Sequence, residues 1–136
     1  MVTIKLDEDI AVMCVSAESF PAGVMAAHQK LHSIVPPSSE RNYYGLSRPE
    51  GSGGIMYVAG AEELQSGEAE KLNLKTIIIK KGRYISATVI DYMKDLPSIG
   101  SIFQQMIARP DVYPEGYCVE WYLNDKDVQC MVRLQD

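Results

Sequence analysis

The most restrictive feature of this sequence is an order of predicted elements that occurs twice. In each half, two strands are followed by a helix and then by two more strands, and a polar connector at 63–73 separates the half at about 1–62 from the half at about 74–136. Strands that alternate with few helices in this way are typical of an α+β fold. The sequence therefore predicts a single domain over 1–136, in which duplicated βαββ-type modules form an antiparallel sheet with two main helices.

The two halves can be aligned by their spacing. Ile78 follows Ile4 by 74 residues, and Pro97 follows Pro21 by 76. At the offset of 76 residues, Tyr44 in the first half corresponds to Glu120 in the second. Since clefts shared by two halves are favoured ligand sites, we expect a groove between the halves with Tyr44 and Glu120 lying across it.

Local patterns place the individual elements. Alternation of apolar and polar residues predicts a hairpin of strands 2–6 and 10–17, and a second hairpin of strands 74–80 and 84–91 with a tight turn at 81–82. Ser19 and Pro21 are suited to start a helix that ends before Pro36, and Pro97 is suited to start a second helix that ends at Pro110. Further strands are expected around 41–47 and at 55–62.

The last two strands, 117–123 and 128–134, contain the most unusual residue of the chain. The first of them is apolar on both faces except for Glu120, and a buried carboxylate costs several kcal/mol unless it is protonated or partnered. Three explanations remain open at this level. Glu120 faces solvent, or a neighbouring group satisfies it, or it belongs to a ligand site where it meets a cation or a reacting group.

Composition and charge narrow the classes of function that the chain can have. The 136 residues are 46% hydrophobic, which is enough for a core, and the net charge of −5 argues against a nucleic-acid surface. The three cysteines form no CxxC motif and are expected to be free thiols in a reducing compartment. No apolar run has the length of a membrane span, and the N-terminus does not resemble a signal peptide, so we expect a cytoplasmic protein without metal or cofactor.

Three short motifs carry a resemblance to a known family. Residues 79–84 read IKKGRY, residues 120–123 read EWYL, and residues 55–60 read IMYVAG. Together and in this order they resemble the GyrI-like small-molecule-binding domain, which is also the effector-binding domain of AraC-type and MerR-type multidrug regulators. The resemblance implies a duplicated SHS2/SOUL-like fold, with Glu120 in a groove that takes lipophilic cations. No helix-turn-helix is apparent, so we expect no direct binding of nucleic acid.

Aromatic residues extend this candidate site. Four tyrosines in predicted strands can form a wall that holds a flat cation by stacking and cation–π attraction: Tyr44, Tyr57, Tyr84 and Tyr122. Trp121 adjoins Glu120 in sequence and is a further candidate. Parity along the strand places Trp121 on the opposite face from Glu120. His28 and His32 are four residues apart but lack a third metal ligand, and they are expected to be partly exposed helix residues.

Three functions are compatible with these residues and with what the resemblance implies. The first is a stand-alone effector-binding protein, in which Glu120 is the counter-charge for a lipophilic cation. The second is a hydrolase of small lipophilic molecules, in which Glu120 activates water or donates a proton and Trp121 or Tyr122 positions the substrate. The third is a protein that binds a protein partner, such as a gyrase inhibitor. The first is the function we expect; the ligand and the oligomeric state stay open.

Overall fold

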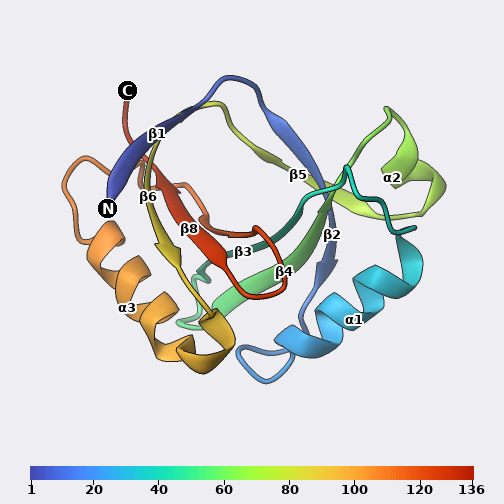
Figure 1. The fold of residues 1–136 in the computed structure, drawn as a ribbon, viewed down its shortest axis with the longest axis horizontal. Helices are drawn as coiled ribbons and strands as arrows, with labels where there is room; N and C mark the ends of the chain where they lie inside the picture. Colours follow the sequence, from blue (N-terminus) through green and yellow to red (C-terminus); the bar gives the residue numbers. More distant parts are fainter.

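A computed structural model describes all of residues 1–136 and shows one curled antiparallel sheet of eight strands with three α-helices (Figure 1). The α+β class and the antiparallel sheet are as the sequence predicts. The strands are β1 (Val2–Leu6), β2 (Ile10–Ser16), β3 (Tyr43–Pro49), β4 (Ile55–Glu62), β5 (Lys75–Ile79), β6 (Gly82–Val89), β7 (Cys118–Tyr122) and β8 (Val128–Arg133). The helices are α1 (Val24–Ile34), α2 (Glu68–Lys71), α3 (Leu96–Ile107) and the short 3-10 helix η1 (Tyr92–Lys94).

The strand order across the sheet is β1-β6-β8-β7-β3-β4-β2-β5. The strands that correspond by position in the two halves are β1 and β5, β2 and β6, β3 and β7, and β4 and β8. If each strand is exchanged with its counterpart, the order is the same when the sheet is read from the other edge. The middle of the sheet is the pairing of β3 with β7, one strand from each half. Both halves therefore share one continuous sheet, whose two edges are β1 and β5.

The two hairpins predicted at the start of each half are wrong. Strand β1 pairs with β6, and β5 pairs with β2, so the first strand of each half joins the other half. The chain crosses over near Asp9, whose carboxylate accepts a hydrogen bond of 2.8 Å from the backbone of Lys81. Alternation indicated that these segments are half-buried strands, but it carries no information on the partner. The β7–β8 hairpin is confirmed.

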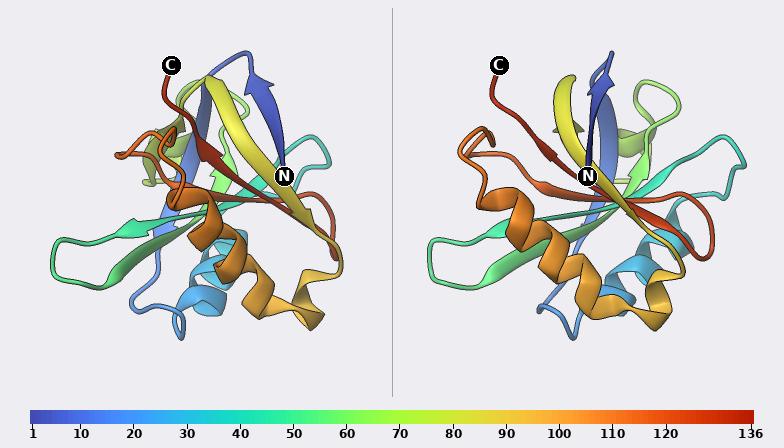
Figure 2. Two further views of the ribbon diagram at one scale, coloured as in Figure 1. Left: turned by 90° about the vertical axis from the view of Figure 1, so that its left-hand side faces the viewer. Right: turned by 60° about the vertical axis from the view of Figure 1, so that its left-hand side comes forward.

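Both main helices lie on the same face of the sheet, as the views in Figure 2 show. Helix α1 packs against β4 and β2, and α3 packs against β8 and β6. Helix α3 begins beside Pro97 as predicted, whereas α1 begins at Val24, with turns in place of its predicted first residues. No helix combines the length and the hydrophobicity needed to cross a membrane.

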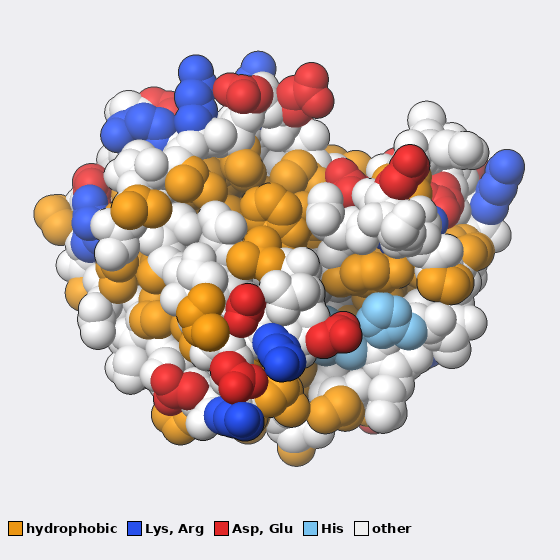
Figure 3. Space-filling model, viewed as in Figure 1, with side chains coloured by type: hydrophobic (Ala, Val, Ile, Leu, Met, Phe, Trp, Pro, Cys, Tyr) orange, Lys and Arg blue, Asp and Glu red, His pale blue; other side chains and the backbone are white.

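Three hydrophobic clusters stabilise this arrangement. One fills the inside of the curl, with Leu46, Val58 and Met131 among its buried members. The second lies under α1 around Leu31, and the third lies under α3 around Met106. Hydrophobic side chains are also visible in the hollow below the β1 and β5 edges (Figure 3). The sheet has two free edges, β1 and β5, and does not close into a barrel, so the inside of the curl is open at its end.

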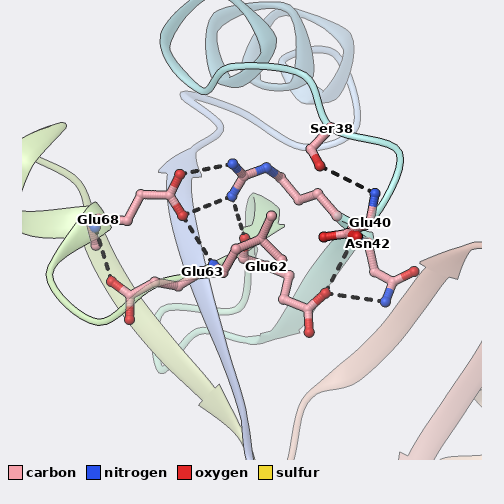
Figure 4. A network of polar contacts seen from close by, with 9 residues as sticks. Ser38, Glu40, Asn42, Glu62, Glu63 and Glu68 are labelled. Carbon is pink, nitrogen blue, oxygen red and sulfur yellow. Dashed lines mark hydrogen bonds and ion pairs between the residues drawn. The ribbon is translucent and has the colours of Figure 1, made fainter.

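A polar network fixes the connector between the halves (Figure 4). The buried guanidinium of Arg41 donates two hydrogen bonds to the carboxylate of Glu68, at 3.0 and 2.8 Å, and a third to the backbone carbonyl of Glu62 at 2.6 Å. Glu63 in turn accepts a hydrogen bond from the backbone of Ala69. The polar connector predicted at 63–73 thus contains α2, and the ion pair between Arg41 and Glu68 docks it onto the sheet.

Candidate functional site

Glu120 lies on the helix-bearing face at the middle of the sheet. In the central β3–β7 pair it is opposite Gly45, and in the β7–β8 hairpin it is opposite Cys130. Because α1 packs on β4 and β2 while α3 packs on β8 and β6, the central pair lies between the two helices. Glu120 is half-buried there, so it is not a fully exposed surface residue.

A chain of hydrogen bonds joins Glu120 to helix α1. The Tyr122 hydroxyl donates to Glu120 Oε1 at 2.6 Å, and the Tyr122 and Tyr57 hydroxyls are 3.0 Å apart. The Tyr57 hydroxyl is 2.8 Å from His28 Nε2. We call these four residues and Tyr92, described below, the Glu120 cluster. It brings together side chains from both halves of the chain.

Gly45 makes this chain possible. Tyr57 on β4 reaches across β3 toward β7, and its ring passes over Gly45. A Cβ at position 45 would overlap the Tyr57 hydroxyl and would lie 2.8 Å from Tyr57 Cζ and 3.1 Å from the Tyr122 hydroxyl. Any other residue at this position would push the two tyrosines apart.

The carboxylate of Glu120 has no cationic partner. None of the four ion pairs in the structure includes it. Burial raises the pKa of Glu120 above its ordinary value of 4.5, and the hydrogen bond from Tyr122 offsets only part of that effect. The ionised form is therefore destabilised in the free protein, and a nearby positive charge would stabilise it.

The hydrogen-bond chain has a defined direction when Glu120 is ionised. Tyr122 donates its only proton to Glu120, so its oxygen accepts from Tyr57, which in turn accepts from His28 Nε2–H. Burial, with a smaller contribution from His32, lowers the pKa of His28 to about 4, so this imidazole is neutral at pH 7. Burial and the charge of Glu120 raise the pKa of both tyrosines. Every member except Glu120 is thus uncharged at neutral pH.

Aromatic rings surround the chain. The Tyr92 ring centroid is 5.7 Å from that of Tyr122, and the His28 ring is edge-on to Tyr122 at 5.3 Å. The Phe20 ring lies 5.9 Å from Tyr57. Such faces attract cations by their quadrupole, so the surroundings of Glu120 favour positive charge even where they are apolar.

A cavity of about 400 Å³ adjoins the cluster at Tyr57. Its lining includes the Phe20 and Tyr57 rings and two carboxylates, Glu18 and Glu50, but no lysine, arginine or histidine. This volume is within the range of small-molecule sites. A ligand in this cavity would contact Tyr57 and lie near the hydrogen-bond chain that ends at Glu120.

The structure divides the predicted site residues between two faces. Glu120, Tyr122 and Tyr57 lie together on the helix-bearing face. Tyr44, Trp121 and Tyr84 instead belong to the cluster inside the curl, on the opposite face. The β3–β7 register places Tyr44 opposite Trp121 and Gly45 opposite Glu120. The expectation that Tyr44 lies across one groove from Glu120 is therefore wrong. An offset between the halves does not give the register of β3 against β7, and a difference of one residue moves a side chain to the other face of the sheet.

Tyr84 is buried, and its hydroxyl donates to the carbonyl of Lys80 at 2.6 Å. Tyr44 is 1% exposed and packs 6.2 Å from Trp121 between ring centroids. These are core contacts on the side of the sheet away from Glu120. The placement of Trp121 opposite to Glu120 agrees with the parity of the strand.

Sequence reasoning missed three contributors: His28, Tyr92 and Gly45. The sequence pattern favours a partly exposed helix residue at His28, yet this residue follows the buried Ala27 directly and borders the apolar stripe of α1. That position was the available signal. Tyr92 lies in a 3-10 helix that no pattern indicated, and Gly45 acts through the space it leaves.

The other reactive groups do not form a recognisable centre. No three His, Cys, Asp or Glu side chains are grouped so as to hold a metal ion. All three cysteines are free, and burial raises the pKa of Cys118 to about 11 and of Cys130 to about 12. Neither thiol is activated as a nucleophile.

No protein-family model matches the chain, and no curated protein matches it in sequence. Solved structures do share its fold. An integron cassette protein from the mobile metagenome of Vibrio cholerae superimposes with a TM-score of 0.71 at 11% identity, over 98% of this chain and 95% of that one. A hydrolase from Listeria innocua superimposes with a TM-score of 0.58 at 10% identity, over 98% and 90%. At such identities the likeness concerns the fold alone.

Proposed function

We propose that the protein binds small lipophilic cations beside the Glu120 cluster. The observation that carries this proposal is a half-buried glutamate whose carboxylate has no cationic partner and lies at the end of a chain of aromatic hydroxyls. A free protein gains little from such a group, because burial disfavours its ionised form. A bound cation would compensate for that cost.

The chemistry around Glu120 supports a flat or aromatic cation. Each suitably placed ring contributes about 0.5–2 kcal/mol of cation–π attraction. The 400 Å³ cavity beside Tyr57 adds two further carboxylates and no basic group. In this proposal the ligand's apolar body lies against Phe20 and Tyr57, and the field of Glu120 selects its charge.

We also assign the chain, as part of this proposal, to ligand-binding domains of the GyrI-like kind with two duplicated modules. The strand order that reads the same from either edge supports duplication. The position of Glu120 on a central strand between the helices supports the family's mode of binding. A groove between the halves would then run along the central β3–β7 pair.

Calorimetry with a matched pair of ligands tests the function. The 10-methylacridinium cation and neutral acridine at pH 8 have the same ring system and differ in charge. We expect Glu120→Gln to weaken binding of the cation by about 10- to 100-fold, the scale for losing one partner of a buried charge pair. Acridine should bind the variant and the unchanged protein alike.

Glu70→Gln is the matched control, because Glu70 is an exposed carboxylate on α2. It should leave both affinities unchanged. If Glu120→Gln weakened the cation and neutral acridine equally, charge would not be the basis of recognition and the proposal would fail.

A second candidate is hydrolysis of a small lipophilic molecule at the same glutamate. The raised pKa of Glu120 favours this role, because burial shifts the carboxyl toward its protonated form, which can donate a proton to a leaving group. One of the structural neighbours, the protein from Listeria innocua, is a hydrolase. Turnover of a candidate substrate that survives in Glu120→Gln would exclude this mechanism.

A further inference from the structure

A second and larger cavity lies at the open end of the curl. It has a volume of about 1030 Å³ and is bounded by the β3–β4 turn, the end of β5 and the loop before β7. Apolar and aromatic side chains of the inner face line its wall, with Met56, Val119, Tyr84 and Tyr117 among them. It shares no Glu120-cluster residue, since that cluster lies on the opposite face.

The rim of this cavity is basic. Arg48, Lys80 and Arg133 lie around it, against Glu50 and Glu115, so the local balance is positive in a chain whose net charge is −5. The other cavity, beside Tyr57, has only acidic residues among its charged lining. The two cavities therefore differ in the sign of the charge that they favour.

Two of the three basic groups are available to a ligand. The Arg48 guanidinium lies 4.7 Å from the Tyr117 ring centroid and forms neither an ion pair nor a side-chain hydrogen bond, and Lys80 likewise has no ion pair. Arg133 is engaged, because it donates to the carbonyl of Lys81 at 3.3 and 3.2 Å. Stacking on Tyr117 holds the Arg48 cation directly at the edge of the apolar wall.

From this geometry we propose a second ligand site for amphipathic anions: molecules with an apolar body and one carboxylate or sulfonate group. The apolar body fills the end of the curl against Met56 and Val119. The anionic group lies at the rim, where Arg48 and Lys80 bind it. The Tyr84 hydroxyl gives no further proton, since it already donates to the carbonyl of Lys80.

Two fluorescent probes with one skeleton test the proposal on the complete chain. 1-Anilinonaphthalene-8-sulfonate carries a sulfonate, and N-phenyl-1-naphthylamine is its neutral counterpart. We expect one saturable site for the sulfonate, with a Kd at least 10-fold lower than that of the neutral probe. Arg48→Gln should raise the Kd of the sulfonate about fivefold or more and leave that of the neutral probe unchanged.

Ile78 provides a pair of variants with opposite expectations. It lines the cavity and is 39% exposed, so a charged residue can be introduced there without burying the charge. Ile78→Lys should lower the Kd of the sulfonate, and Ile78→Glu should raise it. Glu70→Gln serves as the control and should change neither.

Equal affinity for the two probes would overturn the proposal, because the rim charges would then have no role. A shift in the same direction for Ile78→Lys and Ile78→Glu would also overturn it, since that result reports loss of packing and not charge. An unchanged Kd of the sulfonate in Arg48→Gln would have the same consequence.

Discussion

Replacing Gly45 by alanine should break the hydrogen-bond chain without removing any polar group. The added methyl overlaps the Tyr57 hydroxyl, so this buried tyrosine must move away from Tyr122. Two hydrogen bonds are lost, His28 to Tyr57 and Tyr57 to Tyr122, at about 1 kcal/mol each. Overpacking adds about 1–3 kcal/mol, so the expected loss of unfolding free energy is about 3 kcal/mol or more.

Urea denaturation measures this loss. With an m value of about 1.5 kcal/mol/M, the midpoint should fall by about 2 M while the slope stays unchanged. Gly51→Ala is the matched control, because a Cβ there meets open space, and it should leave the midpoint within about 0.5 M.

A double variant identifies the cause. Tyr57→Phe removes the hydroxyl that the new methyl meets, so the double variant Gly45→Ala/Tyr57→Phe should lose at least about 1 kcal/mol less than the sum of the two single losses. Additive losses, or a Gly45→Ala protein as stable as Gly51→Ala, would refute the close approach of Tyr57 over Gly45.

Three further outcomes follow from the titrating groups. The hydrogen bonds from Arg41 lower the pKa of Glu68 to about 2, so the ionised carboxylate adds stability that is complete above pH 4.5 and is lost as the pH falls toward 2. Unfolding measured from pH 6 to 2 should show that Glu68→Gln removes about 1–2 kcal/mol of this pH dependence, a value that allows for screening by water. The ring of His28 should titrate by NMR near pH 4, and its lowered pKa should cost up to about 3 kcal/mol of stability as the pH falls from 6.5 to 4; a midpoint near 6.5 would contradict its burial. The thiols of Cys14, Cys118 and Cys130, with raised pKa values of about 11 to 12, should react with maleimide at pH 7 far more slowly in the folded than in the unfolded chain.

Much of the fold was predictable because local patterns report burial. Pro97 marked the start of α3, and the alternation of 128–134 marked β8. Pairing partners were not predictable in the same way, since an alternating strand such as β1 can bury its apolar face and form its hydrogen bonds beside either β2 or β6. The exchange of β1 and β5 between the halves depends on contacts between residues far apart in the sequence, and local patterns do not report such contacts.

The candidate site was predictable in part. Glu120 drew attention because a carboxylate in an apolar strand needs an explanation, and the parity of its strand placed Tyr122 on the same face and Trp121 on the other. Tyr44 was misplaced because an alignment offset cannot give the register of β3 against β7. His28 was overlooked because a helix pattern does not show which polar residue at its border faces the sheet.

The most direct test of the proposed function is the pKa of Glu120 with and without a bound cation, measured by carbon NMR of its side-chain carboxyl. In the free protein we expect a value above 4.5, because burial disfavours the ionised form. Saturation with 10-methylacridinium should lower this pKa, since a bound cation stabilises the carboxylate, and neutral acridine should not. An ordinary pKa in the free protein, or a pKa that a bound cation leaves unchanged, would contradict a role for Glu120 as the counter-charge.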